Sequence, residues 1–566
     1  MHHRRYSNNK KVYSWLCNQI KGYKLDIFKL ICLNIVISFS TVSIALITKQ
    51  IIDNALNKNI NAAIKFAILF GIVEMVHVIS SYIYPILRTK FREKLTNHLQ
   101  GNFMHQFYHL DWLSSSRHHT GEYHTYLSND IPKVVNGIVD IITTIFAFIF
   151  QLLLAFMALF YFDPLLAIFA CFIGPTSVIF SKLWRQKLKL IAHMIQNTES
   201  RFLSLINETL ENNIIIKAFQ LEKPNSCSIS ELQNDRFHQH VEHTKITAFG
   251  NIALNLGYRG SFFIAFIWGA FRISQGLTTY GTFAAFLQLI GNIQDPIEIL
   301  SQTLPKVINT FSSAERLIYY ENLPKEIPYL TSDFFLHAPI GVKIDGLHFK
   351  YTEELTIFNN ATLYIKPGIM TGIAGASGQG KTTLLYILLG LITPHLGQVE
   401  LFDPENMQTI YSGTRQYFSY VPQGNTLFSG SIYENLCISN PHATIEEIYN
   451  ALKIACAYDF ISQLEQGMHT LLGERGAGLS IGQAQRLCIA RALLSEAPLL
   501  LLDEATSALD QITERTVLTN IKKHIKNKTC IAITHRDSVL SLCEQVFELK
   551  DYQFHPVTPR KKLLLI

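Results

Sequence analysis

The stretch MTGIAGASGQGKTT, residues 370–383, decides how the C-terminal part of this 566-residue chain folds. Its portion from Gly375 to Thr383 matches the pattern G-x-x-x-x-G-K-[ST] at every position, with a β-like run before it and a helical run after it. Glycines in such a loop let backbone N–H groups wrap around phosphates, and the start of the following helix adds its positive dipole. The stretch therefore predicts a nucleotide-binding α/β domain.

Several residues of this loop have chemistry of their own. Lys381 is expected to neutralise charge on the β- and γ-phosphates, and the hydroxyl of Thr382 is expected to bind Mg²⁺. The expected nucleotide contacts in the loop are Gly375, Ser377, Gly378, Gly380, Lys381, Thr382 and Thr383.

A second motif, LLLLDE at residues 499–504, reads as a buried strand that ends in two carboxylates. Asp503 at the strand tip suits Mg²⁺, bound directly or through water. Glu504 is the next residue and points differently, which suits the general base that polarises an attacking water. Without the 375–383 loop, a strand followed by two solvated acids would be the preferred interpretation.

A third motif lies between these two and makes the pattern specific. GLSIGQAQR, residues 478–486, resembles the signature sequence of ABC transporters, which usually reads Leu-Ser-Gly-Gly-Gln. The remaining elements of that family are resembled, in the right order, by Tyr351, Gln423, Gly473–Gly476, Ser507–Asp510 and His535. Residues 335–566 are therefore identified as resembling an ABC ATP-binding domain.

The resemblance implies a role for each matching residue. Tyr351 is expected to stack on adenine, and His535 to contact the γ-phosphate. Ser480, Gly482, Gln483 and Asp510 are expected to contact nucleotide. The implied cofactors are ATP and Mg²⁺, with Thr382, Gln423 and Asp503 as metal ligands. The implied catalytic residues are Lys381, Gln423, Glu504 and His535.

One residue departs from the family pattern. Ile481 stands where the signature has the first glycine of its pair. A β-branched residue limits backbone freedom and adds bulk where the family's loop approaches the γ-phosphate bound to the opposite subunit. We read the site as usable with altered affinity; the alternative is a weakened signature contributed to a partner's site.

The composition indicates a chain of two unlike parts. Hydrophobic residues make up 48% and charged residues 16% of the sequence, against about 25% charged in ordinary soluble proteins. Mean hydropathy is only +0.17, and the composition changes near residue 330. Before that point, six apolar runs are long enough to span the hydrocarbon core. The expected spans are Leu30–Thr48, Phe66–Leu87, Ile141–Phe162, Pro164–Ser181, Ile246–Phe271 and Leu277–Gln294.

The distribution of Lys and Arg predicts the orientation of these spans. The long connections after the second and fourth spans are rich in both residues, and the short connections after the first, third and fifth are poor in them. By the positive-inside rule, the long connections and both termini face the cytosol, as helices that continue out of the membrane. The segment 11–22 reads as a short amphipathic helix on the membrane surface; a solvated leader is the alternative for the first ten residues.

Three ionisable residues fall within the expected spans. Glu74, His77 and Arg259 would be costly facing lipid, so they are candidates for lining a polar pathway. The alternative is that each lies near an interface and reaches the headgroups.

The N-terminal half also resembles ABC exporters. Residues 120–130 resemble their first coupling segment, residues 208–222 their second, and residues 276–281 with Pro296 their turn between the fifth and sixth spans. The expected organisation is an N-terminal cytosolic segment at 1–24, a six-helix transmembrane domain at 25–320 and an ABC ATP-binding domain at 335–566. The fold class is an α-helical membrane domain with long cytosolic extensions plus an α/β nucleotide-binding domain.

The resemblance implies half of a dimeric transporter. In the family, two ATP molecules lie between the phosphate loop of one subunit and the signature of the other, and closure moves coupling segments near 117–127 and 213–220 that dock beside Gln423. A homodimer is favoured because every catalytic element is present; a heterodimer is the alternative. The expected activity is ATP-driven export of a small amphipathic molecule, lipid or peptide across the bacterial cytoplasmic membrane. An ATP-gated channel or regulatory subunit on the same scaffold is the second hypothesis.

Other partners are less well supported. The 49 Lys and Arg against 43 Asp and Glu give a net charge of +6, too small for a nucleic-acid partner. The nine cysteines form no C-x-x-C pair, so neither a zinc ribbon nor a disulfide framework is indicated. Membrane lipid is the expected surrounding of the first half.

Overall fold

The computed structural model describes residues 9–116, 120–326, 336–337, 339–473, 476–524 and 527–557. It separates into two compact units. A helical unit contains the described residues up to 106 and residues 120–322, and the second unit combines residues 107–116 with the described residues from 323 onward. The expected boundary near residue 330 lies outside the described residues.

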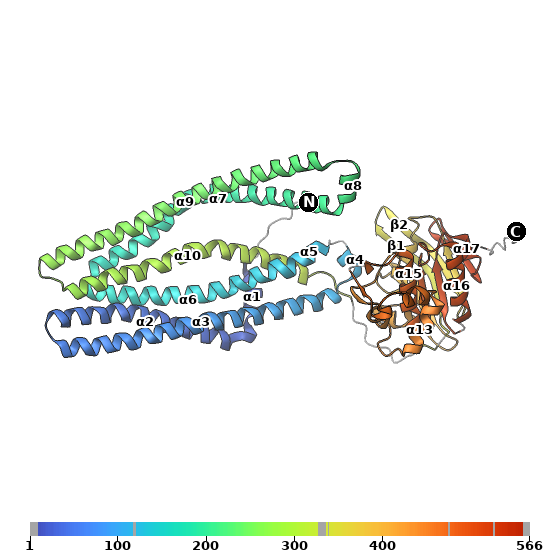
Figure 1. Ribbon diagram of the computed structural model, residues 1–566, viewed down its shortest axis with the longest axis horizontal. Coiled ribbons are helices and arrows are strands. Elements are labelled where there is room, and N and C mark those ends of the chain that lie inside the picture. Colours follow the sequence, from blue (N-terminus) through green and yellow to red (C-terminus); the bar gives the residue numbers. More distant parts are fainter. Residues whose placement is uncertain are drawn as a thin grey trace. The chain divides into compact units, whose positions relative to one another are not determined.

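Long helices make up the first unit, and helices α7 and α9 run side by side in Figure 1. Helix α10 packs against α6 and α2, which also pack against each other. The elements are α1 (Asn9–Gln19), η1 (Lys21–Tyr23), α2 (Lys24–Leu56), α3 (Ile60–Tyr108, whose last two residues belong to the second unit), α5 (Thr120–Thr125), the π-helical turn η2 (Tyr126–Asp130), α6 (Ile131–Phe162), α7 (Pro164–Glu211), α8 (Asn213–Ala218), α9 (Glu222–Ser274) and α10 (Tyr280–Glu321).

Five of the expected spans lie wholly within one long helix each, and the sixth begins three residues before α10. By length and apolar composition, three described segments qualify as membrane spans: 21–56, 60–108 and 121–162. Phe262–Ser274 is a shorter apolar stretch within α9. The spans expected in α7, α9 and α10 therefore stay predictions of the sequence.

Buried carboxylates tie the helix ends together. Asp163, at the turn between α6 and α7, is 1% exposed and accepts hydrogen bonds from Trp268 Nε1 at 3.0 Å and Arg272 Nη2 at 2.7 Å. Asp130, in the π-helical turn before α6, is equally buried and accepts from Ser313 and Arg316 of α10. The hydrogen bonds from these charged and polar donors offset the energetic cost of burying each carboxylate.

A third carboxylate joins three helices. Asp140 of α6 forms ion pairs with Arg88 of α3 and, at 3.1 Å, with Lys306 of α10. The Asp140 side chain is 14% exposed, whereas that of Lys306 is 60% exposed. Two cations on one carboxylate leave a net positive charge at this point. Of the ionisable residues expected within spans, Glu74 and His77 are half-buried and Arg259 is exposed.

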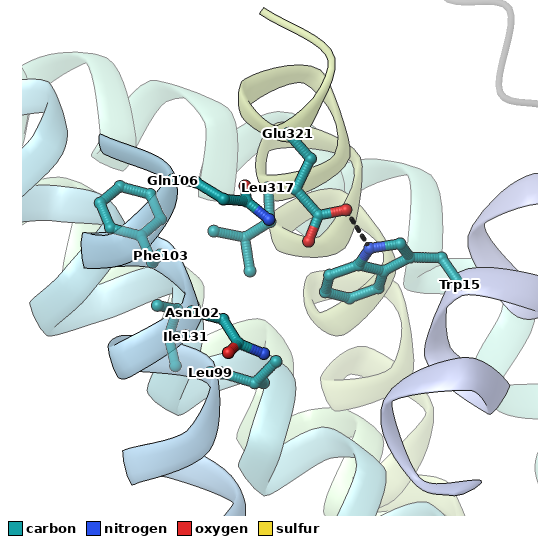
Figure 2. A pocket seen from close by; sticks show the side chains of 8 residues that line it. All are labelled: Trp15, Leu99, Asn102, Phe103, Gln106, Ile131, Leu317 and Glu321. Carbon is teal, nitrogen blue, oxygen red and sulfur yellow. Dashed lines mark hydrogen bonds between the residues drawn. The ribbon is translucent and has the colours of Figure 1, made fainter. Parts of the chain in front are cut away.

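Helix α1 forms as the sequence predicts, and its apolar face is covered by protein. Val12 and Leu16 are buried, and the helix packs against α10. Trp15 Nε1 donates a hydrogen bond of 2.7 Å to Glu321 in the last turn of α10. Figure 2 shows this bond at the edge of a small pocket, with Gln106 and Asn102 of α3 also lining it. Packing on α10 accounts for part of the amphipathic pattern, a contact that the sequence alone does not reveal, and the expected place on the membrane surface stays a prediction.

The second unit is built on two larger sheets. A four-stranded antiparallel sheet has the order β2-β1-β4-β5, and a six-stranded sheet has the order β12-β11-β3-β10-β9-β6, parallel except for β12. The strands are β1 (Gly341–Thr352), β2 (Leu355–Ile365), β3 (Met370–Ala374), β4 (Leu396–Phe402), β5 (Met407–Thr409), β6 (Phe418–Val421), β7 (Gly430–Ser431), β8 (Leu471–Leu472), β9 (Leu499–Asp503), β10 (Thr529–Ile533), β11 (Gln545–Lys550) and β12 (Gln553–Pro556).

Helices cover the parallel sheet, so its central strands are buried. Every residue of β9 and of β10 is buried, as expected for parallel strands with both faces covered. The helices of this unit are α4 (Trp112–Ser116), α11 (Lys381–Leu388), η3 (Ser412–Tyr417), α12 (Ile432–Cys437), α13 (Ile445–Ile454), α14 (Tyr458–Ser462), η4 (Gly467–His469), α15 (Ile481–Leu494), α16 (Gln511–His524) and α17 (Asp537–Leu540).

Residues 107–116 join this unit by backbone pairing. Asp111 N donates to Pro324 O at 3.0 Å, and Glu326 N donates to His109 O at 2.8 Å. The Glu326 carboxylate then pairs with Arg415 at 2.7 Å. The chain that leaves α3 is thereby held beside the chain that follows α10.

Close approach of α6 and α10 yields a test of the helical packing. A Cβ added to Gly137 would lie 1.7 Å from Thr310 Oγ1, so one helix would have to shift. We expect Gly137→Ala to lower the free energy of unfolding by about 1–3 kcal/mol, the usual cost of overpacking. Thermal unfolding of the detergent-solubilised protein measures this loss.

Gly101→Ala in α3 is the matched control, since a Cβ there has nothing within 4 Å. It should leave the unfolding temperature unchanged or raise it slightly, because alanine favours helix. Equal unfolding temperatures for the two variants would contradict the packing of α6 against α10.

Candidate ATP-binding site

Four neighbouring parallel strands end at one edge of the sheet, and each delivers a sequence-predicted residue. The loop 375–383 follows β3, Gln423 follows β6, Asp503 ends β9, and His535 follows β10. The order β3-β10-β9-β6 places these strand ends side by side. Ligands of open α/β sheets bind outside such carboxyl ends.

The phosphate loop has the shape that its glycines permit. Gly380 has φ +99°, and a Cβ there would lie 2.3 Å from Ile357 Cγ2, so both conformation and space require glycine. Lys381 folds back across the loop and donates to Gly375 O at 2.7 Å and Ala376 O at 2.9 Å. Gly380, the N-cap of α11, offers no side chain to the first N–H groups of that helix. A helix start with free N–H groups beside a lysine fits a phosphate group.

Tyr351, which the resemblance expects to stack on adenine, lies beside this loop. Its hydroxyl is 3.2 Å from Thr383 Oγ1, and its ring meets Phe349 edge-on. Thr383 is buried, whereas Thr382 and Ser377 are exposed and open to a ligand.

Asp503 is the buried acid of the site. It is 5% exposed, and the Tyr420 hydroxyl lies 3.4 Å from its Oδ2. Burial raises the pKa of this carboxyl, and the nearby Glu504 charge adds to the effect, while Tyr420 and Lys381 oppose it. A buried carboxylate at the strand edge that also bears the phosphate loop is a suitable ligand for Mg²⁺.

Glu504 is brought together with two other catalytic candidates. Gln423 Nε2 donates to Glu504 Oε2 at 2.7 Å, and His535 Nδ1 is 3.2 Å from Glu504 Oε1. Glu504 has φ +47°, a conformation that costs energy in a residue with a side chain, and its N–H is held by Ile533 O at 3.0 Å. The turn places the Glu504 carboxylate where Gln423 and His535 reach its two oxygens.

The signature residues lie on a separate loop that leads into α15. Ser480 Oγ accepts from Gln483 N at 3.2 Å, and Gln483 Oε1 accepts from Ser480 N at 2.9 Å, so the two form a capping box. A Cβ on Gly482 would lie 3.1 Å from Ala508 O, which explains glycine there. Ile481 is 66% exposed and makes the tip of the loop bulky.

Asp510 caps the next helix. Its Oδ2 accepts from Thr513 N at 2.9 Å, and this bond lowers the pKa of the Asp510 carboxyl. Gln485, which the sequence did not single out, links the signature helix to this region. Its side-chain Nε2 donates to Ser507 Oγ, and its Oε1 accepts from Ala508 N. Of the expected exporter loop Gly473–Gly476, residues 474 and 475 lie outside the described residues, as do residues 117–119 of the first coupling segment.

Two further residues escaped the sequence analysis. Tyr420 stands three residues before Gln423, and that spacing could have pointed to it. Trp112 packs on the core of this unit although it is far from every motif in the sequence. Residues 107–116 belong to this unit and directly precede the segment 117–127, whose coupling role stays a prediction.

Fold and site together define a P-loop nucleotide-binding unit joined to a unit of long apolar helices. Two family models match this pair: "ABC transporter transmembrane region" at residues 27–297 and "ABC transporter" at residues 358–507, which together span most of the chain. The chain belongs to the ABC transporters and is a half-transporter of the exporter type. It is therefore a membrane protein that binds ATP and couples ATP hydrolysis to transport.

Known relatives extend over nearly the whole chain. An ATP-dependent lipid A-core flippase of Desulfotalea psychrophila is 28% identical over 96% of this chain and 95% of its own. A second such flippase, from Syntrophus aciditrophicus, is 27% identical over 90% and 85%. A putative multidrug export ATP-binding/permease protein of Staphylococcus aureus is 27% identical over 94% of both chains.

A solved structure has the same fold. A bacterial Atm1-family ABC exporter with ATP bound superposes with a TM-score of 0.81 over 94% of this chain and 95% of its own, at 21% sequence identity.

The contacts of Glu504 generate a prediction about catalysis. Glu504→Gln keeps the size of the side chain and removes its basicity, so we expect turnover of ATP to fall by about 100-fold or more. ATP hydrolysis by the purified protein measures the loss, and binding of a fluorescent ATP analogue should be retained.

Glu548→Gln, an exposed change on β11, is the control and should leave turnover unchanged. Undiminished turnover of ATP by the Glu504→Gln variant would show that Glu504 is not the general base.

Proposed function

We propose that this protein uses Mg²⁺ and ATP to export or flip a small amphipathic molecule, a lipid or a peptide across the bacterial cytoplasmic membrane. The observation that carries the proposal is the meeting of Gln423, Glu504 and His535 at the sheet edge that also bears the phosphate loop and Asp503. The same chain carries long apolar helices, so hydrolysis and transport have their machinery in one polypeptide.

Each residue of the site has a defined task in this proposal. Lys381 and the N–H groups at the start of α11 bind and orient the phosphates, and Tyr351 supports the adenine ring. Thr382, Asp503 and Gln423 hold Mg²⁺, which supplies charge neutralisation at the transferred phosphoryl group. Glu504 accepts a proton from the attacking water. His535 holds the Glu504 carboxylate in place and contacts the γ-phosphate.

A second subunit completes the assembly that we propose. Ser480, Gly482 and Gln483 serve the nucleotide of the partner, together with Asp510. Exposed apolar side chains at α8 support a partner as well, because Ile214 is 84% exposed and Phe219 is 71% exposed at the tip of the α7–α9 pair. We propose a homodimer, since this chain carries every catalytic element. Native mass measurement of the complex from its own cells distinguishes it from a heterodimer.

The proposed cargo follows the chemistry of the helices and the names of the relatives. The flippases of Syntrophus and Desulfotalea act on lipid A-core, and the Staphylococcus relative is named a putative multidrug exporter. Both activities concern amphipathic molecules, which suit long apolar helices with few internal charges. Lys and Arg in the long connections support cytosolic termini and a cytosolic ATP-binding domain.

Reconstituted vesicles test the transport proposal. The test uses protein whose ATP-binding domain lies on the outer face of the vesicle. ATP added outside should then drive accumulation or flipping of a fluorescent lipid or amphipathic dye. The same cargo should stimulate ATP hydrolysis. Glu504→Gln is the inactive control. Hydrolysis without movement of any cargo in a broad panel would favour the alternative of a gated or regulatory protein.

The bulk of Ile481 yields a separate prediction. Ile481→Gly restores the backbone freedom usual at this position, so we expect the KM for ATP to fall by about threefold or more with little change in stability. Steady-state hydrolysis measures KM, and Ile512→Gly, at an 80% exposed position in the first turn of α16, controls for loss of a surface isoleucine. An unchanged KM would show that the signature tolerates Ile481 fully.

A further inference from the structure

The segment between α3 and α5 presents a tryptophan to the ATP-binding unit. Asp111 Oδ2 accepts from Ser114 N at 3.2 Å and so begins the short helix α4. Leu110 pairs with Lys325 and is 5% exposed, which anchors the segment just before Trp112. Trp112 and Leu113 pack against the apolar core that includes residues of β1, β2 and α11. The position of Trp112 on this unit is therefore set by both backbone and side-chain contacts.

Trp112 meets an aromatic residue of the helix that follows the phosphate loop. Its ring centroid is 5.4 Å from that of Tyr386, with the planes tilted by 60°. This is the geometry of a favourable aromatic pair. Tyr386 lies three residues after Thr383 in α11, so both side chains are on one helix face. Burial raises the pKa of Tyr386, and the nearby Tyr351 and Asp503 add to the effect.

A second tyrosine continues this path to Asp503. Tyr420 pairs with Leu501 in the sheet, two residues before Asp503, and its hydroxyl lies 3.4 Å from Asp503 Oδ2. Burial raises the pKa of Tyr420, with smaller contributions from Asp503 and Tyr386. Tyr386 and Tyr420 both pack against the same apolar core, and the charge of Asp503 adds to the raised pKa of each.

The distance between Tyr420 and Asp503 is informative. An O–H···O bond is usually about 2.7–2.8 Å long, so 3.4 Å is a loose contact. A shift of the tyrosine by a few tenths of an ångström would tighten it or break it. Asp503 has its strand buried on both faces, so the orientation of its carboxylate depends on the groups beside it.

We propose that Trp112, Tyr386 and Tyr420 form an aromatic bridge that couples the seating of residues 107–116 to the orientation of the Asp503 carboxylate. All three act as positioning residues, because none is proposed to touch nucleotide or metal. The bridge rests on the proposed role of Asp503 as a Mg²⁺ ligand. Residues 107–116 are thereby connected to metal binding within the unit to which both belong.

Binding of a fluorescent ATP analogue to the full chain tests the bridge without relying on activity. The measured quantity is the ratio of Kd in EDTA to Kd in Mg²⁺, which reports how much the metal strengthens binding. Tyr420→Phe removes only the hydroxyl and should lower this ratio by about threefold to tenfold. Trp112→Ala should lower it by about twofold to fivefold, and Trp112→Phe should retain most of it.

The double variant and a control separate the bridge from general packing. If Trp112 acts through Tyr420, Trp112→Ala combined with Tyr420→Phe should be no worse than Tyr420→Phe alone. Tyr449→Phe, a tyrosine of α13 that pairs with Tyr458, should leave the ratio unchanged. A lower unfolding temperature in Trp112→Ala with an unchanged Kd ratio would overturn the bridge and reduce Trp112 to a packing residue.

Asp503→Asn distinguishes failure of the bridge from failure of the underlying function. Loss of the Mg²⁺ effect in Asp503→Asn, with unchanged ratios in Tyr420→Phe and Trp112→Ala, would overturn the bridge alone. An unchanged ratio in Asp503→Asn would overturn the metal role of Asp503 and the bridge with it.

Discussion

The ATP-binding unit depends on one constraint: its central parallel strands are buried on both faces, so charged residues collect where the strands end. β9 and β10 have no exposed residue, and the motif residues follow immediately after them. Because parallel strands end at the same edge, short polar sequences that are distant along the chain meet there. The same constraint explains the strained turn at Glu504, where the chain must leave the sheet at once.

Much of this arrangement could be predicted from the sequence, because the motifs are local and the rule for parallel strands is general. The loop 375–383, Asp503, Glu504, Gln423 and His535 all lie at strand ends. Their mutual contacts could not be predicted, since the bonds from Gln423 and His535 to Glu504 depend on the order of strands in the sheet. The packing of Trp112 was equally inaccessible, because no periodic pattern links residue 112 to residue 386.

The helical unit follows another logic. The segments that contain α2, α3 and α6 are apolar enough to be recognised by composition alone, whereas α9 and α10 mix apolar and polar residues. Buried carboxylates explain part of this mixture, because Asp130 and Asp163 need Arg316 and Arg272 beside them. Apolar packing alone would specify only weakly which helices lie next to each other, and such ion pairs determine particular neighbours. The amphipathic pattern of α1 has part of its explanation here too, in the surface of α10.

The bond between Trp15 and Glu321 joins two residues that are 306 positions apart. A ribosome makes Trp15 long before Glu321, which lies at the end of the last helix of the helical unit. Until then, α1 lacks both this hydrogen bond and its packing contact with α10. Seating of α1 is consequently a late event in biogenesis, and it can mark the moment at which the helical unit has been fully assembled.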